Sequence, residues 1–213
     1  MYEYDDYEEI RRLFDPYKEL AYCMVPADSL VKYNPEKQIM QLRFKAAAKP
    51  DLIDVASSIV VNIDGACRDN GKPSARASYG VYFGPGSRYN SSGRLESSIP
   101  QTSTRAEIEA LSKCLDTIRE ITDKDFKLSE IKIVTDSKYL VDSFTRWIEG
   151  WAENDGCSEQ GKKIAHFDTL HAIHKRLDEM EYGDDGGIEC QFWLQPRELN
   201  READALANAA LDA

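Results

Sequence analysis

The sequence has no apolar run long enough to cross a membrane, and its acidic start lacks the basic and apolar regions of a secretory signal. Cysteines are few, five in 213 residues, and no two of them form a C-x-x-C pair. An odd number of such cysteines indicates reduced thiols rather than a disulfide framework. These absences predict an intracellular protein with no membrane partner.

An excess of positive charge is also lacking. The chain has 27 lysines and arginines against 38 acidic residues, a formal net charge of −11 at pH 7. Phosphate neutralisation normally needs a basic face, so the composition excludes a general polyanion binder. We expect any affinity for nucleic acid to be local, modest and salt-sensitive. The 42% hydrophobic content is sufficient for a buried core.

Residues 1–55 differ in pattern from the rest of the chain. Their apolar positions predict one short helical stripe, formed by Ile10, Leu13, Phe14 and Tyr17. Residues 38–44 alternate like a strand, and residues 46–50 are typical of a connector. Because the apolar content is thin, we expect this extension to pack on a main domain, residues 56–213, rather than fold alone.

The main domain has the pattern of a mixed α/β protein. Apolar or alternating segments predict five strands, at residues 59–63, 77–83, 95–99, 130–135 and 188–194. Helical spacing predicts helices in four places, after Thr104, after Ser137, near residues 167–180 and at residues 200–211. The expected sheet has three antiparallel strands, then two parallel ones, and is flanked by helices.

Four acidic residues occupy places that such a fold could bring together: Asp64, Glu107, Asp136 and Asp204. Asp64 ends the first predicted strand and Asp136 follows the fourth, so neighbouring parallel strands would bring both to one sheet edge. Clustered carboxylates repel one another unless cations lie between them, and magnesium prefers oxygen ligands. The pattern predicts a magnesium site that activates water against a phosphodiester.

Each of these residues alone has a plainer explanation. An aspartate after a strand is usually a turn residue or a helix cap, and a glutamate early in a helix complements the helix dipole. Trp147 and Trp151, four residues apart, share one helix face and alone are typical of a core stripe. Only the joint placement of the carboxylates, with Gly65 and Ser137 beside two of them, favours a site.

From about residue 57 to its end, the sequence resembles the type 1 ribonuclease H family. The matching stretches are DGACRDN (64–70), YGVYFGPG (79–86), TSTRAEI (102–108), TDS (135–137), WIEGW (147–151) and NREAD (200–204). The resemblance implies a ribonuclease H-like fold and cleavage of the RNA strand of RNA/DNA hybrids with two Mg²⁺ ions, or Mn²⁺ in their place. It implies that the four carboxylates are the catalytic metal ligands, and that the products carry 3′-hydroxyl and 5′-phosphate ends.

The resemblance also implies a set of substrate contacts: Asn70, Thr102, Ser103, Thr104, Tyr139, Trp147 and Trp151. Asn70, Ser103 and Thr104 match positions at the minor groove of the hybrid, where 2′-hydroxyls distinguish RNA from DNA. The three aromatic residues match positions that contact the DNA strand. The expected partner is an RNA/DNA hybrid, and the expected state is a monomer.

The sequence departs from the family pattern in several places. The loop before Asp204 has neither histidine nor glycine and carries Arg197 instead, while Pro100 and His166 replace phosphate-pocket residues that often accompany Thr102. Acidic residues offset the basic ones after Trp151, and residues 1–55 lack the signature of a hybrid-binding module.

Two other hypotheses therefore stay open. The first is a catalytically weak or inactive scaffold that keeps the fold and binds nucleic acid. The second is a 3′-exonuclease, which usually carries Asp-x-Glu on the first strand where this chain has Asp64-Gly-Ala. We expect His166, His171 and His174 to lie on one ordinary helix rather than in a metal site.

Overall fold

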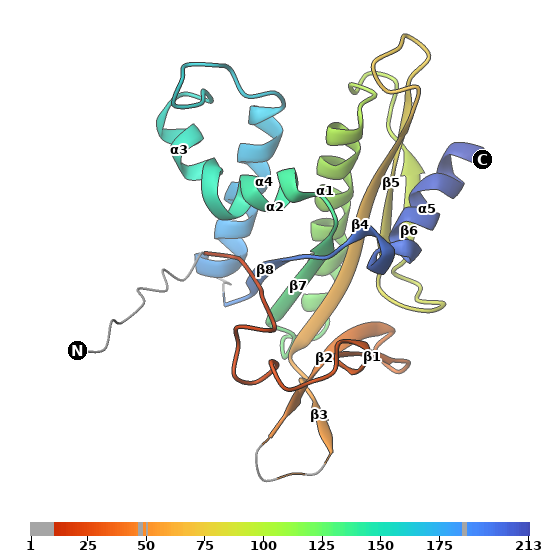
Figure 1. The fold of residues 1–213 in the computed structure, drawn as a ribbon, viewed down its shortest axis with the longest axis vertical. Helices are drawn as coiled ribbons and strands as arrows, with labels where there is room; N and C mark the ends of the chain where they lie inside the picture. Colours follow the sequence, from red (N-terminus) through yellow and green to blue (C-terminus); the bar gives the residue numbers. More distant parts are fainter. Residues whose placement is uncertain (1–10, 47–48, 50, 185–186) are drawn as a thin grey trace.

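The computed structural model describes residues 11–46, 49, 51–184 and 187–213. They form a mixed eight-stranded sheet with helices on both faces (Figure 1). Strand β4 (Ser58–Arg68) pairs antiparallel with β5 (Arg76–Tyr82), which pairs antiparallel with β6 (Ser91–Arg94). On its other side β4 pairs parallel with β7 (Glu130–Thr135), which pairs parallel with β8 (Glu189–Leu194). The expected order of antiparallel and parallel strands is confirmed.

Helices α1 (Ser103–Thr122) and α4 (Phe167–Tyr182) lie on one face of this sheet, and α5 (Arg201–Asp212) lies on the other (Figure 1). Side chains alternate along β4: Ile63 packs in the core that contains α1, whereas Asn62 contacts the residue before α5. Three short segments connect β7 to the loop before α4, namely α2 (Lys138–Asp142), the π-helical η2 (Ser143–Trp147) and α3 (Ile148–Glu153).

Strand β4 does not end at Asp64, as the aspartate–glycine pair led us to expect. It continues to Arg68, and Gly65 pairs with Tyr79 of β5. The glycine serves close packing rather than a turn, because a Cβ atom on Gly65 would lie 2.3 Å from the backbone nitrogen of Glu107. Gly65 therefore allows the first turn of α1 to approach the strand.

Two other predicted element positions are wrong. The third strand is β6, not residues 95–99, and its Ser-Ser-Gly-Arg sequence has no apolar residue to reveal an edge strand. Helix α1 is capped by Thr102 rather than Thr104, since the Thr102 hydroxyl accepts a hydrogen bond from the Arg105 N–H at 3.1 Å. Ser137 caps α2 as predicted, by accepting from the Leu140 N–H.

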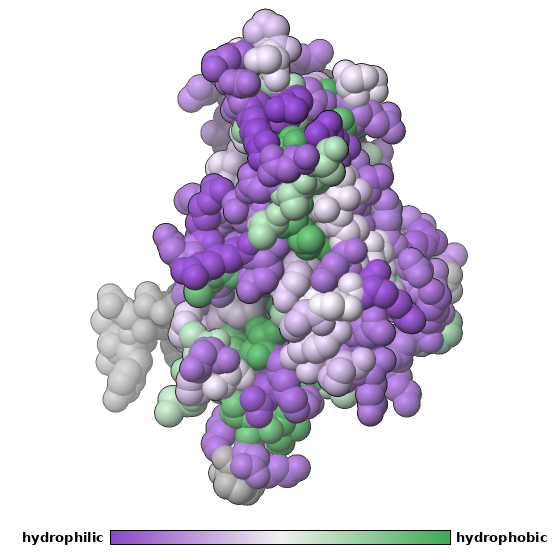
Figure 2. All heavy atoms as spheres, turned by 90° about the vertical axis from the view of Figure 1, so that its right-hand side faces the viewer, coloured by the Kyte–Doolittle hydropathy of each residue, from purple (hydrophilic) through white to green (hydrophobic). Residues whose placement is uncertain are grey.

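The N-terminal segment adds three strands to the sheet. They are β1 (Val31–Asn34), β2 (Ile39–Lys45) and β3 (Leu52–Asp54), and they follow a short 3₁₀ turn, η1 (Ala27–Ser29). Strand β2 pairs with β1 and β3 and joins β4 through Met40 and Val60. Figure 2 shows hydrophobic side chains gathered at the end of the molecule where these strands lie.

A second core lies between this segment and the sheet face that α5 leaves uncovered. Phe14 is 1% exposed and packs edge-on against Trp193 of β8, with 5.2 Å between the ring centroids. The helical stripe predicted around Phe14 is wrong within the described residues, because this part forms turns and a bridge from Leu13 to Phe192; Ile10 lies outside them. Tertiary pairing with β8 overrides the local helical spacing.

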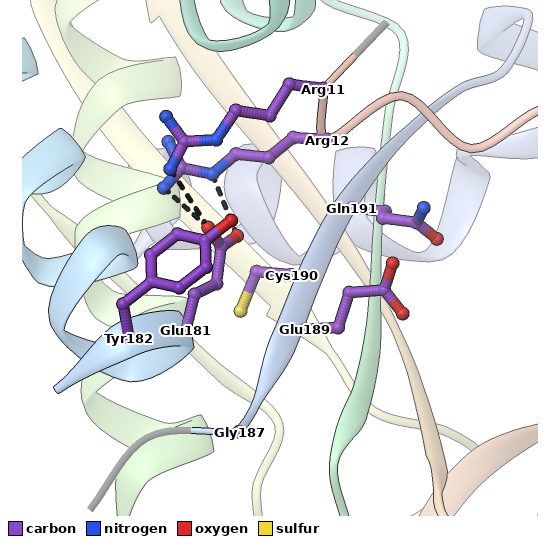
Figure 3. Close-up of a pocket in the computed structure, with 8 residues that line it drawn as sticks. All are labelled: Arg11, Arg12, Glu181, Tyr182, Gly187, Glu189, Cys190 and Gln191. Carbon is purple, nitrogen blue, oxygen red and sulfur yellow. Dashed lines mark hydrogen bonds and ion pairs between the residues drawn. The ribbon is translucent and has the colours of Figure 1, made fainter. Parts of the chain in front are cut away.

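Arg12 anchors the segment to α4 (Figure 3). Its side chain is 2% exposed, with Nε donating to Glu181 at 2.9 Å and Nη2 donating to Asp178 at 2.8 Å. Its Nη1 lies 2.9 Å from Nδ1 of His174, and its backbone has a left-handed φ of 62°. A buried arginine needs such partners, because an unpaired buried charge is costly.

Candidate functional site

Three carboxylates converge at one edge of the sheet. Asp64 lies within β4 and is 3% exposed, and Asp136 directly follows β7, the parallel neighbour of β4. Glu107 comes from the first turns of α1, which packs on Gly65. Each residue offers a carboxylate oxygen, and these oxygens all lie within 4.8 Å of one another. The structure thus brings together three of the four predicted ligands.

The electrostatics of this cluster favour a bound cation. Burial, followed by the charges of Asp136 and Asp204, raises the pKa of Asp64 to about 7. Burial and the charges of Asp64 and Asp136 hold the pKa of Glu107 well above its usual range. In addition, Oε2 of Glu107 is buried and has no hydrogen-bond partner. A set of carboxylate oxygens, one of them buried without a hydrogen-bond partner, fits a hard divalent cation.

Asp204 lies beside the three-carboxylate group but outside it. It is in the first turn of α5, and Arg197 of η3 (Arg197–Leu199) donates to its Oδ1. Its negative charge nevertheless contributes to the raised pKa of Asp64. The structure therefore places Asp204 at the rim of the cluster with an arginine as counter-ion.

The predicted aromatic contacts form one row. The rings of Tyr139 and Trp147 are 6.2 Å apart between centroids, and those of Trp147 and Trp151 are 5.6 Å apart. Trp147 is 39% exposed, whereas Trp151 also packs against the main core. Trp147 and Trp151 border a hollow with Arg146 and Gly150. The row thus combines the predicted exposed contact surface with the core stripe of the plainer explanation.

The predicted minor-groove residues also meet. The Asn70 amide donates to the Ser103 hydroxyl at 3.3 Å, which joins the loop after β4 to the start of α1. Thr104 is half-buried in the same first turn, directly after Ser103. Thr102 is the helix cap described above. All four residues therefore surround the end of α1 that carries Glu107.

The histidines do not form a metal site among the residues that the structure describes. His171 and His174 lie on α4, with ring centroids 6.5 Å apart. His166 precedes the helix in a left-handed conformation, so the prediction of one shared helix is wrong for it. Burial and the charge of Arg105 lower the pKa of His166.

Comparison with protein-family models matches residues 56–192 to RNase H. The chain belongs to the RNase H family. Ribonuclease H1 of Mus musculus is 34% identical over 157 residues, which cover 72% of this chain and 50% of that protein. Ribonuclease H1 of Homo sapiens is 32% identical over 153 residues, covering 70% and 48%. The chain thus spans about half the length of these curated relatives.

A solved structure shares the fold of this chain. The foamy viral protease-reverse transcriptase in complex with an RNA/DNA hybrid has a TM-score of 0.58 and 19% identity, and the match covers 78% of this chain and 22% of that one. Identity at this level shows the fold alone. Across the described residues, no helix is both long and apolar enough to span a membrane, and all five cysteines are free thiols.

Sequence reasoning missed one buried residue at the site. Asn200 is 1% exposed and its amide bonds to β4, next to Asp64. Its place at the start of the NREAD motif was a signal, but an asparagine before a helix is usually read as a cap. The structure shows no side-chain capping bond from it.

Proposed function

We propose that this RNase H-family chain is a metal-dependent endoribonuclease that hydrolyses the RNA strand of RNA/DNA hybrids. The convergence of Asp64, Glu107 and Asp136 within 4.8 Å carries the proposal. The names of the ribonuclease H1 relatives and the hybrid bound to the foamy viral enzyme support the same substrate class.

The carboxylates would hold the metal, with Mg²⁺ as the proposed ion and Mn²⁺ as its substitute. Asp64 faces the site from within β4, Asp136 from just after the neighbouring β7, and Glu107 from α1, and Asp204 would complete the ligand set from α5. When bound, two divalent ions supply an activated water and stabilise the leaving oxygen of the phosphodiester. The protein's contribution is to fix the oxygen ligands at the end of a rigid sheet.

The substrate contacts are assigned by their place around this cluster. Asn70, Ser103 and Thr104 would contact the minor groove and its 2′-hydroxyls, next to Glu107. Thr102 would contact a phosphate. The row of Tyr139, Trp147 and Trp151, of which Trp147 is exposed, would lie along the sugars of the DNA strand.

We also propose that residues 56–213 form the catalytic domain and that residues 1–55 are an extension packed on it. The pairing of β2 with β4 and the contact of Phe14 with Trp193 support this division. A monomeric state stays a prediction.

The test is cleavage of an RNA/DNA hybrid labelled in either strand, beside all-RNA and all-DNA duplexes of the same sequence. With Mg²⁺ or Mn²⁺ we expect internal cuts in the RNA of the hybrid alone. Asp136→Asn should abolish them, and Asp168→Asn, an exposed aspartate of α4, should not. Cleavage only from the 3′ end would indicate the exonuclease.

One observation favours the scaffold as a second candidate. Pro100 and His166 stand where type 1 members of the family often carry phosphate-pocket residues, and the protein has a net charge of −11, which weakens phosphate binding. Binding of the hybrid without cleavage in the presence of either Mg²⁺ or Mn²⁺ would support the scaffold. The four carboxylates argue against it, because an inactive site has no physical reason to keep repulsive charges together.

A further inference from the structure

Asn200 lies between β4 and α5, beneath the carboxylate cluster. Its Nδ2 donates to the carbonyl of Ile63 at 2.9 Å, and that carbonyl belongs to the peptide bond that leads into Asp64. Its own backbone carbonyl accepts from the N–H of Asp204 at 3.1 Å. One buried residue therefore bonds to the backbone of Asp204 and to the carbonyl of the residue before Asp64.

The orientation of the Asn200 amide is set by a second asparagine. Asn62 of β4 donates from Nδ2 to Oδ1 of Asn200 at 3.0 Å. Because this donor occupies the amide oxygen, the amide nitrogen must face the Ile63 carbonyl. The parallel pairing of β4 with β7 ends at Asn62, and the Asn200 amide binds the carbonyl of the next residue of β4, Ile63.

Asn200 also ends the turn that precedes α5. Its backbone N–H donates to the carbonyl of Arg197 at 3.0 Å and closes η3. The backbone of Asn200 therefore bonds both to Asp204 and to Arg197, the counter-ion of Asp204. The Asn200 side chain therefore links both Arg197 and Asp204 to β4.

We infer that Asn200 is a positioning residue of the metal site, which sets Asp204 at a fixed place relative to Asp64. The inference rests on the metal site of the proposed function. Without the amide contact, the first turn of α5 would lose its link to β4, and Asp204 would no longer be held where a shared cation needs it. Groups that orient metal ligands commonly affect metal affinity about tenfold or more.

The rest of α5 has its own contacts, so the inferred effect is local. The Ser78 hydroxyl donates to the carbonyl of Ala207 at 2.6 Å, and a Cβ on Gly80 would lie 2.3 Å from the carbonyl oxygen of Ala203. These contacts hold α5 against β5 from its first turn, at Ala203, to its middle, at Ala207. Loss of Asn200 should therefore loosen the junction of η3 and α5, and the Asp204 side chain with it, while the helix stays docked on β5.

The test is calorimetric titration of the metal-free protein with Mn²⁺, which needs no substrate. We expect Asn200→Ala to weaken Mn²⁺ binding about tenfold. Asn62→Ala should weaken it less, because the amide keeps its bond to Ile63. Asn208→Ala is the matched control: its amide donates to the Asp204 carbonyl within α5 and makes no bond to β4, so affinity should stay at the wild-type value.

A double-mutant cycle with Asp204→Asn decides how Asn200 acts. If it acts through Asp204, Asn200→Ala should weaken binding no further in the Asp204→Asn background. Equal losses in both backgrounds, or an unchanged affinity of Asn200→Ala despite a lower Tm, would overturn the inference. Where Asn200→Ala does not fold, Asn200→Ser, which also removes the amide donor to Ile63, takes its place with the same criteria. Absence of Mn²⁺ binding by the wild type would instead contradict the proposed metal site.

Discussion

Arg197 donates a hydrogen bond to Asp204 at the rim of the acidic cluster, so the fourth proposed ligand is paired with a cation of its own chain. The side chain of Arg197 is 70% exposed and that of Asp204 29% exposed. The charges of Asp204, Asp64 and Asp136 raise the pKa of Arg197. A divalent ion that uses Asp204 must therefore compete with this arginine.

This competition predicts the effect of Arg197→Ala. An exposed ion pair contributes about 0.2–1 kcal/mol, so its loss should tighten Mn²⁺ binding by up to about fivefold. Calorimetric titration of the variant measures this. Arg201→Ala is the control, because Arg201 takes part in none of the ion pairs found in the described parts of the chain. Weaker binding by Arg197→Ala would show that the arginine supports the site.

A second prediction concerns the repulsion within the cluster. In metal-free protein at pH 8, Asp64→Asn should raise the free energy of unfolding by about 1–3 kcal/mol, because it removes one buried charge from among like charges. The urea midpoint with a chelator present measures this. Added Mg²⁺ should raise the Tm of the wild type and of Asp168→Asn, but not of Asp64→Asn. A metal-free variant less stable than the wild type would argue against net repulsion.

A third prediction concerns the extension. Phe14 is 1% exposed and packs on Trp193, and Nζ of Lys132 lies 4.9 Å from its ring centroid. Phe14→Ala should lower the free energy of unfolding by about 3–5 kcal/mol. Tyr17→Ala, at a residue 65% exposed, should change it by less than about 0.5 kcal/mol. Urea unfolding compares the two, and equal small losses would contradict an extension that packs on the domain.

A fourth prediction is a pH dependence of stability. Burial, together with the positive charges of Arg12 and Arg11, lowers the pKa of His174 although Asp178 acts in the opposite direction. The geometry agrees, because Nδ1 of His174 faces a guanidinium donor of Arg12 and Nε2 lies 3.3 Å from Asp178. The folded state thus favours neutral His174.

The direction of the pH dependence of stability follows from this preference for neutral His174. As the pH falls below about 6.5, the unfolded chain takes up a proton that the folded His174 does not, so stability falls by up to about 1.4 kcal/mol per pH unit. His174→Gln should lack this contribution between pH 7.5 and 5.5, whereas His171→Gln should resemble the wild type. Glu149 and Glu181, which pair with Arg11 and Arg12 beside His174, are unchanged in both variants. Parallel urea curves for wild type and His174→Gln across this range would refute the prediction.

The sequence predicted the elements with strong apolar patterns. Residues 130–135 were placed within β7 as observed, and Ser137 was identified as a cap. It misplaced β6, whose residues are polar, and it ended β4 at the Asp64–Gly65 pair, since a glycine required by a neighbouring helix looks the same in sequence as one required by a turn. Local patterns thus indicate elements, but not the close contacts between them.

The candidate site shows the same limit. Asp64 and Asp136 could be paired from the sequence because each comes shortly after the apolar residues of one of two parallel neighbouring strands, although β4 runs on past Asp64. The ion pair of Asp204 and the bond from Asn200 to Ile63 could not be predicted from the sequence, since both depend on how the turn before α5 meets β4. The contact of Arg12 with His174 joins positions 162 residues apart, and no local pattern indicates it.

The most direct test of the account is the rate of internal RNA cleavage in a hybrid by wild type and Glu107→Gln, both with Mg²⁺ and both shown to be folded. Glu107 joins the other two carboxylates within 4.8 Å and has a buried oxygen without a partner. We predict a loss of at least about 100-fold in the variant, since removal of a metal ligand removes the charge stabilisation that the site supplies. A variant that cleaves the hybrid as fast as the wild type would contradict the account.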